Sequence, residues 1–149
     1  MKIRIKLSKQ GAMKIIGHPD TMRYFQKAMR RADVDIRYSE GFSPHQIMSF
    51  AAPLGVGLTG CGEYLDIEVL STDSSAEMVK RLNDTMVEGV EVLSYRKLPD
   101  DAENAMSIVA ACDYTIVLRD DYENGLSMTP EEFYNGILVF IENGHLNIV

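Results

Sequence analysis

The sequence predicts an α+β fold, and three patterns lead to that prediction. Charged and apolar residues alternate along 2–7 and again along 63–70, as in strands with one buried face. Between them, the apolar residues of 19–32 recur every three or four positions, which is typical of an amphipathic helix. The chain has 149 residues, 46% of them hydrophobic and 25% charged, which is the composition of a globular protein.

The first helix is marked by its start and by its two faces. Pro19 is favoured at a first helical position, and Asp20 suits the positive end of the helix. The apolar side chains that we expect to face the core are Met22, Phe25, Met29 and Ala32. Four cations fall at i, i+4, i+7 and i+8 and form a basic stripe with no acidic partner at those spacings: Arg23, Lys27, Arg30 and Arg31.

Further elements follow in alternation. Short strands are predicted at 35–39 and 47–51, separated by a loop with Gly41 and Pro44, and a glycine-rich turn precedes the strand at 63–70. Ser74 or Ser75 caps a helix that runs to about residue 86, and a strand covers 90–97. The residues of that helix expected to point inward are Ala76, Val79, Leu82 and Met86. This order, β-α-β-β-α-β, predicts a ferredoxin-like module over residues 1–98.

Residues 99–149 predict an incomplete second module, a partial β-α-β unit. Residues 98–104 are polar and acidic and are predicted to form a linker. A strand at 111–119 precedes a helix that Thr129 caps, with Glu132 three residues later in a capping box. A last strand starts at 146, so we expect either a truncated chain or a short natural form.

Charge is unevenly distributed along the chain. The net charge is −7, yet residues 1–45 carry ten Lys/Arg and four Asp/Glu, whereas residues 46–149 carry five and eighteen. This asymmetry indicates a basic surface for nucleic acid or another partner. The alternative is that opposite charges interleave once the chain folds.

The sequence excludes several classes of protein. No apolar run is long enough to span a bilayer, and the N-terminus lacks the continuous apolar stretch of a signal peptide, so we expect a cytoplasmic protein without membrane partners. Cys61 and Cys112 form no metal-ligand motif, and we expect both in the core. No metal site is predicted, and the glycines around Gly55 lack the spacing and the following helix of a nucleotide-binding loop.

The segment from His18 to His45 holds the candidate site. In one interpretation the two imidazoles act as general base and general acid on a phosphodiester beside arginine. In the other, His18 caps the helix and His45 binds the backbone of its loop. The basic stripe suits a phosphate backbone on which an aromatic ring stacks a base. The binding candidates are Arg23, Lys27, Arg30, Arg31, Arg37, Tyr38 and Phe42.

These segments resemble one bacterial family. The motifs are Gly17-His18-Pro19-Asp20 through Phe25, Ala28 through Ala32, Tyr38 through His45, and the stretches around Gly55 and Glu63-Tyr64-Leu65-Asp66. Together they resemble the radical-SAM-associated domain of unknown function. Two positions depart from the usual family pattern, Pro19 in place of leucine and Gln46 in place of a second proline. The motif residues expected to shape the site are Gly17, Asp20, Gly41, Pro44, Gly55, Glu63, Tyr64 and Asp66.

The resemblance implies an accessory module that acts with a radical SAM enzyme, by binding RNA or the enzyme itself. The chain would need no cofactor, because the partner enzyme would carry S-adenosylmethionine and an iron-sulfur cluster. Two alternatives stay open: a metal-independent ribonuclease that uses His18 and His45, and a scaffold that binds only protein.

Overall fold

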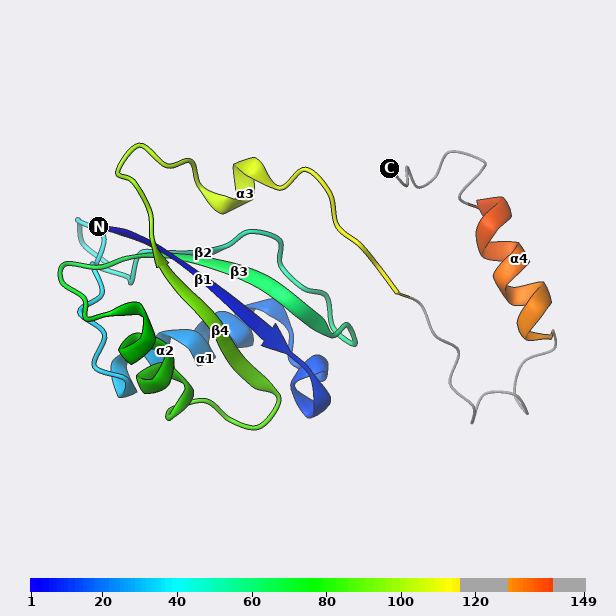
Figure 1. Cartoon of the computed structure of the whole chain (residues 1–149), viewed down its shortest axis with the longest axis horizontal. Helices are drawn as coiled ribbons and strands as arrows, with labels where there is room; N and C mark the ends of the chain where they lie inside the picture. The colour runs from blue at the N-terminus through cyan, green and yellow to red at the C-terminus, as the bar shows by residue number, and fades with distance from the viewer. Residues whose placement is uncertain (116–128, 141–149) are drawn as a thin grey trace. The chain divides into compact units, whose positions relative to one another are not determined.

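The computed structural model describes residues 1–115 and 129–140, which belong to two compact units, Met1–Val109 and Ala110–Val149 (Figure 1). The elements follow in the order β1 (Lys2–Lys9), η1 (a 3-10 helix, Gly11–Ile15), α1 (His18–Arg31), β2 (Met48–Phe50), β3 (Gly60–Glu68), α2 (Ser75–Asn83), β4 (Val90–Lys97), α3 (Ala105–Ile108) and α4 (Pro130–Phe140). The last of these belongs to the second unit.

The first unit is a mixed α/β structure built on a four-stranded antiparallel sheet. The strands lie in the order β2-β3-β1-β4, and each neighbouring pair is antiparallel. β1 and β2 therefore run parallel to each other with β3 between them. This sheet places the chain segment between α1 and β2 at one edge, beside β3.

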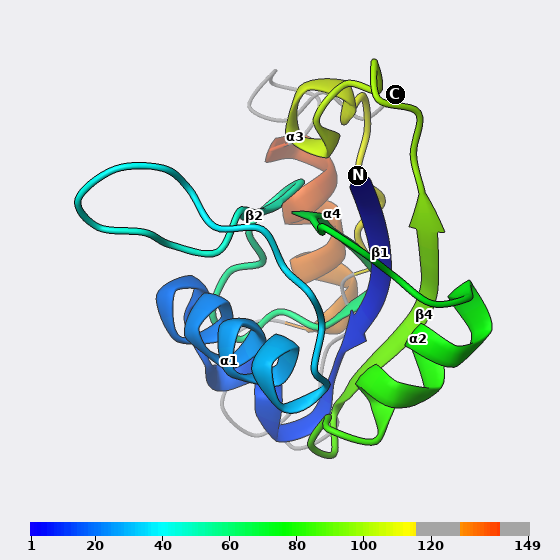
Figure 2. The same ribbon diagram turned by 90° about the vertical axis from the view of Figure 1, so that its left-hand side faces the viewer.

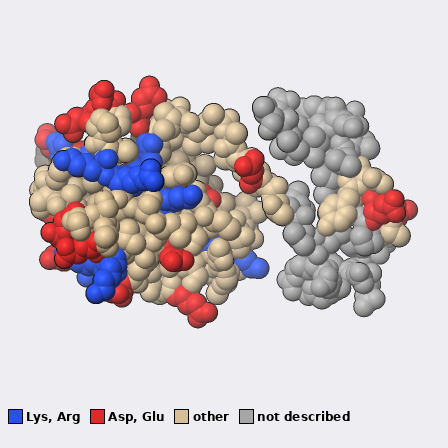
Figure 3. Space-filling model, viewed as in Figure 1, with Lys and Arg blue, Asp and Glu red and all other residues tan. Residues whose placement is uncertain are grey.

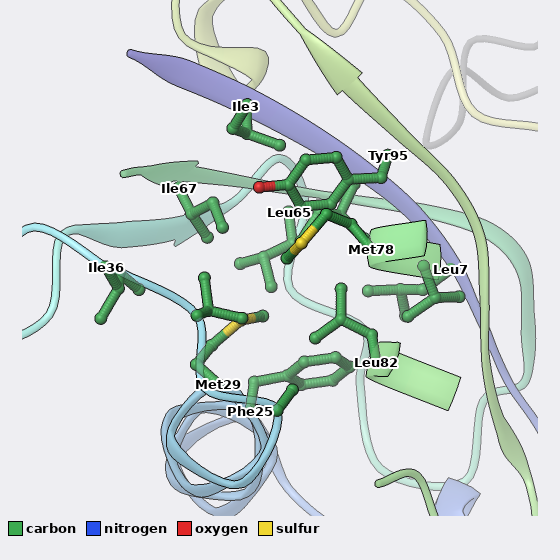
Figure 4. Packing of buried hydrophobic residues seen from close by; sticks show 14 of the residues in the cluster. Ile3, Leu7, Phe25, Met29, Ile36, Leu65, Ile67, Met78, Leu82 and Tyr95 are labelled. Atoms are coloured by element: carbon green, nitrogen blue, oxygen red, sulfur yellow. The ribbon is translucent and has the colours of Figure 1, made fainter. Parts of the chain in front are cut away.

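The core lies between the sheet and the two helices α1 and α2. Ile5 of β1 pairs with Leu65 of β3 and with Tyr95 of β4, so one apolar row crosses the sheet. Figure 4 shows the helix side chains that pack on this face: Phe25 and Met29 from α1, and Met78 and Leu82 from α2. Each is at most 1% exposed, and burial of such a side chain contributes about 1.5–3 kcal/mol.

The opposite face of the sheet is polar and carries the segment 99–109. The Lys2 ammonium donates a hydrogen bond to the Ala102 carbonyl at 2.7 Å, and the Ala105 amide donates to Asp66 Oδ2 at 2.7 Å. These two bonds tie the segment to the sheet, although most of residues 98–104 are exposed, as predicted for a connection. The compact units divide after Val109, eleven residues beyond the predicted end of the first module.

The strand predicted at 35–39 is reduced to two isolated bridges. Ile36 pairs with Val69, and Tyr38 pairs with Gln46. Hydrogen bonds from this segment alternate between two different neighbours, since the Arg37 amide donates to β3 and its carbonyl accepts from the 46–48 segment. No regular ladder can form on that pattern. α1 itself begins and ends one residue before the predicted bounds.

α2 keeps its predicted cap but ends earlier than predicted. Ser74 Oγ accepts a hydrogen bond from the Glu77 amide, as expected of an N-cap. The side chain of Asn83 exchanges two hydrogen bonds with the backbone of Val92, at 2.8 and 3.0 Å, and this ties the helix end to β4. Ala76, expected to point inward, is exposed, and Met78 occupies the core instead.

The second unit contains the predicted capping box. Thr129 Oγ1 accepts from the Glu132 amide at 3.2 Å, and Glu132 Oε2 accepts from the Thr129 amide at 2.7 Å. Of the strand predicted at 111–119, residues 111–115 have no strand structure. Residues 116–119, the helix beyond 140 and the strand predicted from 146 lie outside the described residues.

Both cysteines were expected in the core, and that expectation is wrong. Cys61 and Cys112 are exposed, free thiols. Cys61 is the second residue of β3, and its sulfur accepts a hydrogen bond from Gln10 Nε2 at 3.6 Å. Cys112 belongs to the second unit, whereas the apolar cluster is formed by residues 3–95 of the first.

Candidate functional site

The four cations of the α1 stripe are all exposed, and they differ in their partners. Arg23 forms an ion pair with Asp20 at 3.3 Å, with both side chains more than two thirds exposed, so the stripe has an acidic neighbour that the spacing argument missed. Arg31 turns toward α2, where it donates to the Thr85 carbonyl at 3.3 Å and lies 5.9 Å from the Tyr24 ring. Such exposed contacts are weak and leave the charges accessible to a ligand.

Lys27 and Arg30 are the least engaged cations of the stripe. In the described part of the chain, neither side chain takes part in an ion pair. Arg30 lies beside Tyr38, and both line a cleft of about 570 Å³ at the C-terminal end of α1. The hydrogen bond from Gln46 lowers the pKa of Tyr38, and the nearby Arg30 lowers it further. These residues bring a cation and an aromatic ring to the same place.

The loop between Tyr38 and Gln46 is closed at its base. The Ser39 amide donates to the His45 carbonyl at 2.8 Å, and the Ser39 hydroxyl bonds His45 Nδ1 at 2.8 Å. His45 Nδ1 also lies 3.4 Å from the Ser43 carbonyl, so the imidazole contacts both a side chain and the backbone of its own loop. Gly41 has a φ of 116°, which side chains rarely adopt, so this turn requires glycine.

Phe42 lies near the tip of this loop, and its side chain is fully exposed, at 110% of the reference area. Pro44 beside it is also exposed. Figure 2 shows the loop projecting away from α1 and the sheet. Because hydrogen bonds between Ser39 and His45 close the base of the loop, the loop that carries the Phe42 ring is held in place.

Gln46 anchors the loop to α1. Its side chain is only 3% exposed, and its Nε2 donates both to the Gln26 carbonyl and to the Tyr38 hydroxyl, each at 3.3 Å. At this position the family resemblance leads one to expect proline, which could donate no such bonds. The glutamine thus fixes Tyr38 relative to the helix.

His18 is the first residue of α1 and lies in different surroundings. Gly17, and not His18, is the N-cap, and its carbonyl accepts from the Thr21 amide at 2.9 Å. The half-buried imidazole meets the Phe50 ring edge-on, with the ring centroids 5.6 Å apart. It also lines a cavity of only about 10 Å³, which is room for a single water molecule.

Two charged groups line the same small cavity, and sequence reasoning gave neither a chemical role. Lys9 is 3% exposed, and its ammonium donates to the Ile16 carbonyl at 2.7 Å. Burial lowers the pKa of Lys9 and raises the pKa of Glu63, while the two charges partly offset these shifts. Lys9 lies two residues beyond Leu7 at the end of β1, where the pairing with β3 shifts register and where Leu7, Ser8 and Lys9 are all buried.

The structure does not bring His18 and His45 together. Gln46, next to His45, rests on the carbonyl of Gln26, which is eight residues along α1 from His18. A helix rises about 12 Å over eight residues. Acid and base catalysis on one phosphodiester would need both imidazoles within hydrogen-bond reach of it, whereas here His18 contacts Phe50 and His45 bonds Ser39.

The remaining predicted residues lie away from the α1 face. Arg37 pairs with Glu68 of β3 at 3.2 Å. Asp66 accepts two hydrogen bonds from Arg4, at 2.8 and 2.9 Å, so it is a structural partner on the polar sheet face. Tyr64 lies on that face under the Lys6 ammonium, 5.9 Å from ring centroid to nitrogen. Gly55 packs against Leu58 in the loop before β3.

A second basic surface covers the polar face of the sheet. Figure 3 shows Lys and Arg side chains gathered over β1 and β4. Arg4 and Arg96 are directly opposite each other in the β1–β4 pairing. The charge of Arg4 is balanced by Asp66, whereas Arg96 is exposed and has no ion pair among the described residues. The sequence argument did not include Arg96, since cross-strand pairing cannot be read from a single strand.

Within residues 1–115 and 129–140, no three His, Cys, Asp or Glu side chains come together as a metal site. No helix in the same ranges is both long and apolar enough to cross a membrane.

A search of curated proteins finds no significant match to the chain. A family model described as an uncharacterized protein conserved in bacteria, DUF2344, matches residues 2–144. Because that match covers nearly the whole sequence, the chain belongs to the bacterial family DUF2344.

Proposed function

We propose that this protein binds single-stranded RNA through the exposed face of α1 and the loop formed by residues 39–46. The observation that carries the proposal is the position of Phe42, whose ring is fully exposed. Its loop is bound to α1 by the hydrogen bond from Gln46 to the Gln26 carbonyl. Exposed cations of α1 provide charge for phosphates, and an aromatic ring can stack on any base. A braced loop also reduces the entropy lost on binding.

The proposed role in the cell is that of an accessory module for a radical SAM enzyme. Its support is the motif resemblance described above. The enzyme would bring S-adenosylmethionine and the iron-sulfur cluster, and this chain would hold the RNA. A cytoplasmic location belongs to the same proposal.

We also propose that the first unit is a ferredoxin-like module. Its support is the sheet order β2-β3-β1-β4, in which β3 separates the parallel strands β1 and β2 as in a split β-α-β unit. Such modules serve many functions, so the fold adds nothing to the argument for RNA.

The test is fluorescence anisotropy of a labelled, unstructured RNA oligonucleotide with the full chain, across a series of salt concentrations. We expect affinity to fall steeply with salt. The double variant Lys27→Gln/Arg30→Gln removes two phosphate contacts and should reduce the slope of log K against log salt by about 1.4. Phe42→Ala should weaken binding by about 1–3 kcal/mol with an unchanged salt slope, because it removes stacking alone.

The matched control is Lys6→Gln/Arg96→Gln, which removes the same charge from the polar sheet face. We expect this variant to bind RNA as the wild type does. If both double variants lose RNA affinity equally, binding depends only on overall charge. If only the control loses affinity, the RNA binds the polar face of the sheet. No binding at low salt would overturn the proposal, and a complex with the enzyme would then be the role to test for this surface.

A further inference from the structure

A cleft beside Arg30 opens on the surface of the first unit. It has a volume of about 570 Å³ and lies where the segment after α1 meets the segment before α2. Small-molecule sites commonly occupy 300–1,000 Å³. The residues that matter for its chemistry are Arg30, Asp33, Asp35, Tyr38, Asp73 and Arg81.

Several charged groups of the cleft already have partners within the protein. Asp35 accepts a hydrogen bond from the Ser71 hydroxyl at 2.6 Å, and its carbonyl accepts from the Leu70 amide at 2.8 Å. Arg81 forms an ion pair with Asp73 at 3.1 Å. The Asp35 bonds join the two walls and the Arg81–Asp73 pair stabilises the wall at α2, so the cleft is organised before a ligand arrives.

Three groups of the cleft take part in no ion pair among the described residues, although Arg30 hydrogen-bonds the Tyr38 hydroxyl. Arg30 and Asp33 form no ion pair within residues 1–115 and 129–140, and Tyr38 is 43% exposed. Asp33 adopts a φ of 49°, a conformation in which glycine would be more stable. Aspartate at this position is less stable than glycine would be, yet it places a carboxylate at the cleft. This loss of stability favours a functional role for the carboxylate.

This combination matches the parts of a nucleotide. Arginine binds a phosphate by charge-assisted hydrogen bonds, a carboxylate accepts hydrogen bonds from the exocyclic amine of a base, and a tyrosine ring stacks on its face. We propose that the cleft is a mononucleotide pocket that holds one amine-bearing nucleotide, adenylate or cytidylate, of the bound RNA. The inference deepens the proposed function and rests on it for the source of the nucleotide.

The test uses the full chain, labelled with ¹⁵N, titrated with CMP and with UMP, which lacks the exocyclic amine. Shift changes should map to residues 30–38 and 71–73, and CMP should bind several-fold more tightly than UMP. Cytidine without its phosphate should bind about tenfold more weakly than CMP, because the contact with Arg30 is lost.

Variants separate the two recognition groups. Arg30→Gln should weaken CMP about tenfold, while the control Arg96→Gln, an exposed arginine of β4 that does not line the cleft, should leave CMP binding unchanged. Asp33→Asn tolerates the same backbone conformation and should abolish the preference for CMP over UMP. Tyr38→Leu should weaken both nucleotides alike.

The outcomes distinguish this inference from the proposed function. RNA binding that persists while CMP shifts nothing at the cleft overturns the pocket and leaves the RNA proposal intact. CMP binding at the cleft without RNA affinity supports the pocket and overturns the RNA proposal. Inorganic phosphate that binds as tightly as CMP, with no difference between CMP and UMP, would show a plain anion site and overturn the inference.

Discussion

At the scale of single residues, Asp33 shows how the C-terminal end of α1 is built. The Val34 amide donates to the Met29 carbonyl at 3.0 Å and the Asp33 amide donates to the Arg30 carbonyl at 3.2 Å, which is the hydrogen-bond pattern of a Schellman motif. The residue in the left-handed conformation is normally glycine, and here it is Asp33, with a φ of 49°. This end of the helix therefore carries avoidable strain.

The first prediction concerns that strain. Asp33→Gly should raise the free energy of unfolding by about 0.5–1 kcal/mol, because glycine adopts the left-handed conformation without steric cost. Urea unfolding followed by circular dichroism gives the measurement, with Asp35→Gly, at an ordinary φ, as the control that should lose stability. If Asp33→Gly is less stable than the wild type, the carboxylate makes a stabilising contact that this structure does not contain. The same variant should lose the preference for CMP.

A second prediction concerns Glu63, whose pKa burial raises above its ordinary value of 4.5. The folded state then binds the proton more tightly than the unfolded state, so stability falls as pH rises from about 4.5 through the folded-state pKa. Glu63→Gln has no such group. The free energy of unfolding of Glu63→Gln minus that of the wild type should therefore increase as pH rises from about 4.5 through the folded-state pKa of Glu63. Above that pKa the difference should stay constant.

Urea midpoints from pH 4 to pH 7 measure this difference. A constant difference between Glu63→Gln and wild type across the range would contradict the assignment. The lowered pKa of Lys9 has the opposite effect on stability. Because the folded state loses this proton more easily than the unfolded state, the free energy of unfolding should rise with pH between the folded-state pKa of Lys9 and 10.5.

At the scale of elements, the segment 99–109 is held to the sheet through one carboxylate. Asp66 accepts from Arg4 and from the Ala105 amide at once, and its side chain is 17% exposed. Arg4 in turn donates to the Glu103 carbonyl at 3.0 Å. The charge pair therefore joins β1, β3 and the segment in one network.

The third prediction tests that network. Asp66→Asn leaves the guanidinium of Arg4 without its counter-ion in a mostly buried place and should destabilise the unit by about 1–3 kcal/mol. Hydrogen exchange of the amides in 102–106 should accelerate selectively. Glu68→Gln is the control, because the Arg37–Glu68 pair is more exposed and should contribute less than about 1 kcal/mol. Uniform acceleration across the whole sheet would indicate global destabilisation in place of a local release.

Local patterns explain which elements the sequence could predict. The α1 periodicity placed Phe25 and Met29 in the core, and the capping signals at Ser74 and Thr129 are both used as expected. These features depend on residues within a few positions of one another. The alternation in β1 also identified the buried face correctly as far as Leu7.

Features that depend on distant contacts could not be predicted. The burial of the charged Lys9, the hydrogen bonds that tie 99–109 to the sheet and the exposure of Cys61 all depend on contacts with segments that are distant in the sequence. The cleft joins residues near Arg30 with residues near Arg81, far apart in the sequence. Sequence reasoning therefore found Arg30 and Tyr38 and gave no role to Asp33 and Arg81.

At the scale of the whole molecule, the two compact units differ in charge. Residues 1–109 carry 14 Lys/Arg and 15 Asp/Glu and are nearly neutral, whereas residues 110–149 carry one and seven. The net charge of −7 therefore comes mostly from the second unit. The first unit is therefore nearly neutral overall but has basic surfaces that a polyanion can bind, and the exposed face of α1 is one of them.

The last prediction concerns the independence of the first unit. The apolar cluster described for the chain is formed by residues between Ile3 and Tyr95. A fragment of residues 1–109 should therefore fold with a denaturant midpoint close to that of the first unit in the full chain. A fragment of residues 1–98 loses the hydrogen bonds from Lys2 to Ala102 and from Ala105 to Asp66, so it should be less stable by about 1–3 kcal/mol.

The comparison of these two fragments by urea unfolding decides where the module ends. Equal stability would mean that the segment 99–109 contributes little and that a boundary near residue 98 is energetically adequate. Failure of both fragments to fold would mean that the first unit requires residues beyond 109. The 1–109 fragment should also bind RNA more tightly than the full chain at low salt, because it lacks the net charge of −6 of the rest of the chain, and the difference should vanish as salt screens it.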